Sequence, residues 1–190
     1  MISSKFAIMP ASADVHADKL SEVNPKQMMN ALRTALYKMG AATATGWIFV
    51  GFHGEFDPVA KVYRPHFHGV AYGGMVQVVD RLRTMPNYKT SRWLPDGSPS
   101  PVYRRVQMTR KPVNRLPRPL TYLVQSFWPA RALWVSEDGR RRRARQKRRI
   151  PEPYHSQVLL WLDKWSINDL TLMIGLRVTT NGLKQTKPVS

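Results

Sequence analysis

The spacing of hydrophobic residues predicts an amphipathic helix early in the chain. Asn24 can cap free backbone N–H groups at its start, Pro25 suits the first helical position, and Gly40 is a natural end. Between them, apolar side chains recur every three or four residues, at Met29, Leu32, Leu36 and Met39. We expect this helix to pack on a sheet.

Aromatic and β-branched residues in short runs predict the strands of that sheet. Residues 47–55 and 63–72 are two such runs, separated by a turn-like segment that contains Asp57 and Pro58, and they predict an antiparallel hairpin. Residues 5–10 and 102–109 predict two further strands, the second of which we expect to extend the same sheet. Short helices are expected over residues 75–83 and 120–128.

The C-terminal part of the chain predicts helices. Apolar residues at Val158, Leu159, Leu162 and Trp165 mark one helix, and Ser166 with Asp169 resembles the start of a second that ends near Gly175. The predicted fold class is therefore α+β: an antiparallel sheet with helices packed on it, plus C-terminal helices. Residues 1–135 would form the main domain, residues 136–152 a basic flexible segment, and residues 153–190 a helical appendage packed on the same domain.

The charge of the chain points to a polyanionic partner. Its 190 residues carry 30 Lys and Arg against 12 Asp and Glu, a formal net charge of +18. Nucleic acid is the first candidate, because no apolar run approaches the ~20 residues that span a bilayer. There is no cysteine, which excludes disulfides, thiolate metal sites and a cysteine nucleophile. The N-terminus does not form a signal peptide, so a cytoplasmic protein is expected.

Most of the expected phosphate contacts come from one run. Residues 140–149 hold eight basic residues in ten, a pattern typical of a solvated segment that binds phosphates without sequence preference. The candidate DNA-binding residues are Arg104, Arg105, Arg110, Lys111, Arg140, Arg141, Arg142, Arg143, Arg145, Lys147, Arg148 and Arg149. Trp93 and Trp128 are candidates for stacking on bases, although burial is the favoured interpretation of Trp128.

The segment around His66 and His68 carries the most specific chemistry. Residues two apart on a strand share a face, so both imidazoles point the same way. If the hairpin is symmetric about residues 60 and 61, Glu55 lies opposite His66 and His53 lies opposite His68, all on that face. A shift of two residues would change only the partners, whereas a shift of one would turn Glu55 away.

Imidazoles and a carboxylate without a thiolate suit a divalent ion with open coordination positions, such as magnesium or manganese. Glu55, His66 and His68 are the candidate ligands, with His53 beside them. Two alternatives remain: the histidines hydrogen-bond within a polar sheet face, or they form a cupin-type site. The second is disfavoured, because residues 69–74 contain no acid.

These residues resemble the HUH endonuclease superfamily, whose metal motif is two histidines flanking a bulky apolar residue, here Phe67. Residues 54–56 and 64–70 are similar to the pattern in rolling-circle replication initiators of small single-stranded DNA phages and plasmids. The resemblance covers the chain to about residue 128. It implies an HUH-like endonuclease domain over residues 1–135 in which Glu55, His66 and His68 hold the metal.

The resemblance also implies a nucleophilic tyrosine on a helix after the later strands, a place that Tyr122 occupies. The family commonly has a lysine three residues on, whereas this chain has Gln125, which shares the helix face but carries no charge. Related transposases place Gln or Asn four residues on, where Ser126 stands here. Tyr122 taken alone is better explained as core filling, and the rival nucleophiles are Tyr154, Tyr103, Tyr88 and Tyr37.

The implied activity is nicking and joining of single-stranded DNA through a 5′-phosphotyrosine. Host replication proteins are possible further partners, and a membrane is not expected. The alternatives are a non-catalytic nucleic-acid-binding protein on a decayed HUH fold, or a single-strand DNA transposase. The sequence leaves open the recognised DNA, the metal, the oligomeric state and whether Gln125 permits activity.

Overall fold

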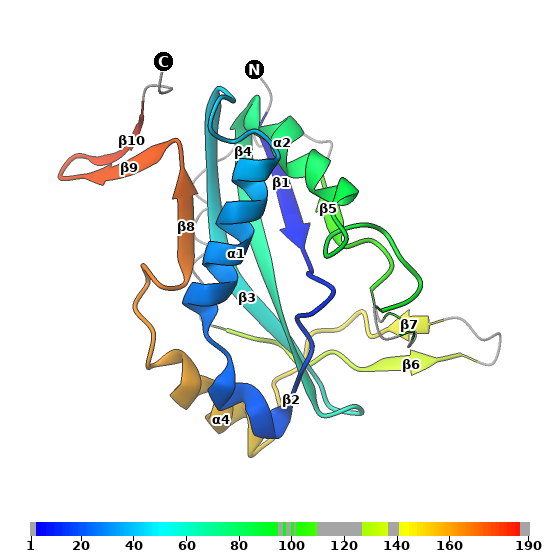
Figure 1. Ribbon diagram of the computed structural model, residues 1–190. Helices are drawn as coiled ribbons and strands as arrows, with labels where there is room; N and C mark the ends of the chain where they lie inside the picture. The colour runs from blue at the N-terminus through cyan, green and yellow to red at the C-terminus, as the bar shows by residue number, and fades with distance from the viewer. Residues whose placement is uncertain are drawn as a thin grey trace.

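An antiparallel sheet forms the centre of the computed structural model, which describes residues 3–94, 97, 100, 102–109, 127–136 and 141–186 (Figure 1). Its strands run in the order β5 (Val106–Met108), β1 (Ser3–Ile8), β4 (Val62–Gly73), β3 (Gly46–Asp57) and β8 (Thr171–Ile174), and β2 (Val15–His16) pairs with the start of β4. Every pairing in this sheet is antiparallel. The α+β class and the central hairpin are therefore confirmed.

Helix α1 (Pro25–Lys38) crosses in front of the sheet in Figure 1. The Asn24 side chain accepts a hydrogen bond from the backbone N–H of Gln27 at 3.1 Å, and Gly40 has a φ of 102°, so both predicted ends are confirmed. The other helices are α2 (Met75–Arg81), α4 (Tyr154–Leu162) and the short 3₁₀ helices η1 (Ala17–Glu22) and η2 (Leu82–Thr84).

The main core lies between α1 and one face of the sheet. Leu32 and Leu36 of α1 pack in one cluster with Ile48 and Phe52 of β3 and Phe67 of β4. Because side chains alternate along a strand, the intervening residues of β3 and β4 face away from α1. The predicted ligands all belong to this second set.

The register of the hairpin differs from the prediction by two residues. His53 lies opposite His66, and Glu55 lies opposite Arg64. The reason is the turn: Asp57 pairs with Val62, and the Asp57 carboxylate accepts backbone hydrogen bonds from the two residues after Pro58, which centres the turn earlier. The shift is even, so the predicted face is right although the predicted partners are wrong.

The prediction of a second C-terminal helix is also wrong. Ser166 donates to the Asp169 carboxylate at 2.8 Å as expected, but this pair closes only a turn. Residues 171–174 then form β8 on the edge of β3, because Leu172 and Ile174 are buried at alternating positions as a strand requires. β9 (Leu176–Thr179) and β10 (Gly182–Gln185) follow as a hairpin.

Part of the basic run forms backbone pairs with the segment that precedes it. β6 (Leu133–Val135) pairs with β7 (Arg141–Arg143), and Ala130 and Arg148 exchange two backbone hydrogen bonds of 2.8 and 3.2 Å. Upstream, the segment around Ala130 is tied to β3, since Phe56 donates to the Pro129 carbonyl and accepts from the Arg131 N–H. The described end of the expected helix at residues 120–128 is thus not helical. In the described residues, no helix has the length and apolar character needed to cross a membrane.

Candidate functional site

Three histidines gather on the sheet face opposite α1. The ring centroids of His53 and His66 lie 4.9 Å from that of His68, and 6.3 Å from each other. The Nε2 atoms of His66 and His68 are 3.1 Å apart. The predicted convergence of these side chains is confirmed, and it follows from the even register of β3 and β4.

Burial keeps the two paired imidazoles neutral. It is the main reason why the pKa of His66 falls to about 4 and that of His68 to about 3, and nearby histidines and cations contribute to the same shifts. The Nδ1 atom of His66 lies 2.9 Å from the Arg64 carbonyl, which can only accept, so Nδ1 carries the proton. The Nε2 atom of His66 therefore carries the lone pair and accepts the hydrogen bond from Nε2 of His68.

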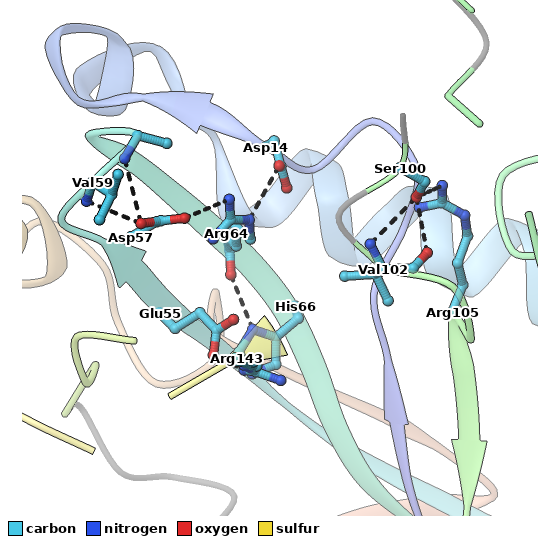
Figure 2. A network of polar contacts seen from close by, with 11 residues as sticks. Asp14, Glu55, Asp57, Val59, Arg64, His66, Ser100, Val102, Arg105 and Arg143 are labelled. Carbon is cyan, nitrogen blue, oxygen red and sulfur yellow. Dashed lines mark hydrogen bonds and ion pairs between the residues drawn. The ribbon is translucent and has the colours of Figure 1, made fainter. Parts of the chain in front are cut away.

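Glu55 lies on the same face of β3 and is 4% exposed. Its carboxylate forms an ion pair with the guanidinium of Arg143, which reaches it from β7 (Figure 2). In the chain as described, no three His, Asp or Glu side chains are grouped so as to hold a metal ion. The carboxylate that would be the third ligand faces an arginine.

A pocket of about 210 Å³ opens over the histidines. Phe127, Pro129 and Arg131 line it, whereas the alternating residues Trp128 and Ala130 are buried in the core. The remaining walls come from the sheet, from β7 and from the basic run: Ala7, Met9, His53, Gly54, Glu55, His66, His68, Gln107, Arg143 and Lys147. Among the described residues, three cations, Arg131, Arg143 and Lys147, and one carboxylate, that of Glu55, thus line the pocket.

A buried ion-pair cluster lies beside His66 on β4. The Arg64 guanidinium lies between Asp14 and Asp57, with nitrogen–oxygen distances of 3.2 and 3.1 Å (Figure 2). The backbone carbonyl of Arg64 accepts the hydrogen bond from Nδ1 of His66. Burial raises the pKa of Asp14, although the Arg64 charge opposes this. This cluster fixes the backbone on which the orientation of His66 depends.

The predicted DNA-binding residues divide into three groups. Arg105 is 3% exposed and donates to the Ser100 hydroxyl at 2.7 Å, a position that does not suit a phosphate contact. Arg104 is exposed and borders a second, larger hollow beside β5, which shares Gln107 with the histidine pocket. In the basic run, the exposed basic side chains among the described residues are those of Arg142, Arg145, Lys147, Arg148 and Arg149.

Several predicted residues lie outside the described part of the chain: Tyr122, Gln125, Arg110, Lys111 and Arg140, together with the side chain of Arg141. Of the rival tyrosines, Tyr88 is buried and its pKa is raised to about 12, and Tyr154 packs on Phe56. Tyr103 and Tyr37 are exposed. Trp128 is 2% exposed, which agrees with burial rather than stacking on bases.

Sequence reasoning missed Arg131 and the special position of Arg143. Arg131 lies in a stretch without a motif, and only the alternation of residues 127, 129 and 131 beside β3 brings it to the pocket. Arg143 was one of eight similar basic residues, and nothing local distinguishes the one that reaches Glu55.

No protein-family model, curated protein or solved structure matches this chain.

Proposed function

We propose that this protein nicks and rejoins single-stranded DNA in a metal-dependent reaction, as a rolling-circle replication initiator. The observation that carries the proposal is the convergence of His53, His66 and His68 on one sheet face, with buried Glu55 two residues from His53. This arrangement agrees with the resemblance of the same residues to HUH endonucleases.

The two imidazoles and the carboxylate are ligand types that would suit a divalent ion such as magnesium or manganese once Glu55 is released from Arg143. His66 has its lone pair on Nε2, His68 is neutral at physiological pH, and Glu55 supplies a carboxylate on the same face. A bound divalent ion would polarise a non-bridging phosphate oxygen and stabilise charge in the transition state. Glu55, His66 and His68 would hold it, with His53 beside them.

Tyr122 is the proposed nucleophile. A bond forms between its phenolic oxygen and a backbone phosphorus while the bond from phosphorus to the 3′ oxygen breaks; the phenol loses its proton, and the 3′ oxygen gains one. The product is a 5′-phosphotyrosine that a 3′-hydroxyl can later attack. Phe127 lines the pocket, and the chain from Tyr122 to Phe127, five positions on, can span at most about 18 Å.

Single-stranded DNA is the proposed substrate, because a phosphate of a stacked duplex could not enter a 210 Å³ pocket. The hollow beside β5 would continue the path of the strand past Gln107, where Arg81, Arg83 and Arg104 line its wall. The net charge of +18 adds affinity that does not depend on sequence.

The proposal is tested by incubating the protein with labelled single-stranded DNA and manganese, and resolving covalent adducts on a denaturing gel. Tyr122→Phe should abolish the adduct. Tyr72→Phe is the matched control, because Tyr72 shares the face of the histidines but lies four residues from His68, roughly 13 Å along the strand. An adduct that persists in Tyr122→Phe would contradict the proposed nucleophile.

Binding without cleavage is a second candidate function. The ion pair between Glu55 and Arg143 favours it, because a paired carboxylate is not a ready metal ligand, and Gln125 lacks the charge of the family's lysine. Salt-sensitive DNA binding by the wild-type protein, without an adduct in manganese or magnesium, would support this alternative.

A further inference from the structure

The ion pair of Glu55 and Arg143 joins two residues that are 88 positions apart in the sequence. A terminal nitrogen of the Arg143 guanidinium bonds Glu55, whereas its Nε is buried and has no acceptor in the described part of the chain. The Nε atom of Arg131 is also buried, and none of the described residues accepts a hydrogen bond from it. Buried donors without acceptors are uncommon in proteins, and two in one pocket indicate a ligand that accepts hydrogen bonds.

The charge around the pocket specifies the ligand further. Among the described residues that line the pocket, Arg131, Arg143 and Lys147 face one carboxylate, that of Glu55. Planar guanidinium groups match the paired oxygens of a phosphate, which accepts several hydrogen bonds at once. A phosphodiester of a nucleic-acid backbone satisfies both the charge and the unused donors.

Resting on the function proposed above, we propose that Arg131 and Arg143 form a phosphate subsite beside the histidines, and that Arg143 exchanges Glu55 for a DNA phosphate when a metal ion engages Glu55. A cation held by Glu55 and the histidines would lie next to the Arg143 charge, and like charges at such a separation repel. The incoming phosphate removes this repulsion and takes over the Arg143 donors. Metal and DNA binding are thereby coupled through one side chain.

The exchange predicts opposite effects of one substitution. Arg143→Gln frees Glu55, so manganese should bind the DNA-free protein at least about fivefold more tightly, measured by loss of the free-ion EPR signal. In wild type, a short single-stranded oligonucleotide should tighten manganese binding by a similar factor, and by linkage manganese should tighten the oligonucleotide equally. Arg143→Gln should abolish this mutual effect.

Two further variants separate the exchange from general effects. Lys184→Gln removes a positive charge on β10, outside the pocket and the basic run, and should leave the manganese affinity and the coupling unchanged. Arg131→Gln should weaken the coupling without tightening manganese in the DNA-free protein, because Arg131 does not pair with Glu55. Circular dichroism melts establish that each variant is folded. Arg143→Lys keeps the positive charge but loses the planar guanidinium, so its manganese affinity and its coupling should lie between those of wild type and Arg143→Gln.

All measurements use the Tyr122→Phe background, so that cleavage plays no part in them. Unchanged manganese affinity and unchanged coupling in Arg143→Gln would overturn the subsite, whatever the nicking assay gives. Changed affinity and lost coupling would support it, even if no phosphotyrosine forms and the proposed nuclease function fails. Absence of manganese binding in every variant would overturn both proposals.

Discussion

The indole ring of Trp128 packs directly on the backbone of Gly54, the residue between His53 and Glu55. A Cβ at position 54 would lie 2.4 Å from ring atoms of Trp128, far inside van der Waals contact. Gly54 is thus required by packing on the core face, while its neighbours serve the opposite face. The glycine next to Glu55 therefore has a structural reason of its own.

Gly54→Ala should lower the free energy of unfolding by about 2 kcal/mol, because the Trp128 ring is enclosed and cannot move aside cheaply. Urea denaturation monitored by tryptophan fluorescence measures the loss. In a Trp128→Leu background, the same substitution should cost much less, since the ring is gone. Equal costs in both backgrounds would rule out this contact as the cause.

Arg64→Met should destabilise the protein by about 3 kcal/mol at neutral pH, because it leaves two carboxylates, Asp14 and Asp57, near one another without their cation. Arg149→Met is the control: its pair with Glu152 is exposed on both sides, and its loss should leave the free energy of unfolding unchanged within experimental error. Chemical denaturation of the two variants gives the comparison. Similar small losses would show that the Arg64 cluster contributes little.

The metal-free protein should lose stability as the pH falls from about 6.5 towards 4. His66 and His68 have folded-state pKa values of about 4 and 3, below the ordinary 6.5, so the unfolded chain binds more protons in this window. The neutral histidines make their full contribution to the free energy of unfolding above pH 6.5. This contribution falls by on the order of 2 kcal/mol as the pH drops towards 4.

Unfolding at about pH 7.5 and pH 4.5 tests this for wild type and for His66→Gln, which should lose less on acidification. His16→Gln is the control, because His16 is exposed and pairs only with Asp18. If His66→Gln lost as much unfolding free energy between the two pH values as wild type, groups other than His66 would cause the pH dependence.

Binding to single-stranded DNA should weaken steeply with salt, and the exposed residues of the basic run should set the slope. Arg145→Gln should reduce the magnitude of the slope of log affinity against log salt by about 0.7, alike for different sequences. Lys184→Gln, on the β9–β10 hairpin, should leave the slope unchanged. Fluorescence anisotropy over a salt series measures both, and equal slopes for all three proteins would exclude a role for Arg145.

The parts of the site that were predictable depend on short-range periodicity. His66 and His68 share a face because a strand alternates, and Glu55 joins them for any even register. The register itself depends on how Asp57 organises the turn, which the spacing of residues does not reveal. The contact of Arg143 with Glu55 spans 88 residues and depends on where β7 lies relative to β3, so no local pattern predicts it.

The C-terminal prediction failed for a related reason. Ser166 and Asp169 form the side-chain pair expected at a helix start, but the edge of β3 between Ile48 and Gly51 offers backbone partners to residues 171–174. Pairing with that edge and burial of Leu172 outweigh the local helix signal. Tertiary context decided the element, as it did for β6 and β7.

The central claim is that Tyr122 becomes linked to DNA in a reaction that needs the histidine site. The most direct measurement is mass spectrometry of the protein after incubation with single-stranded DNA and manganese, nuclease trimming and tryptic digestion. Residues 116–131 form one tryptic peptide, because Arg118 precedes proline, and Tyr122 is its only tyrosine. The account predicts a 5′-phosphonucleotide on this peptide in wild type and none in His68→Asn. A nucleotide on another tyrosine, or a DNA-linked peptide of equal yield in His68→Asn, would contradict it.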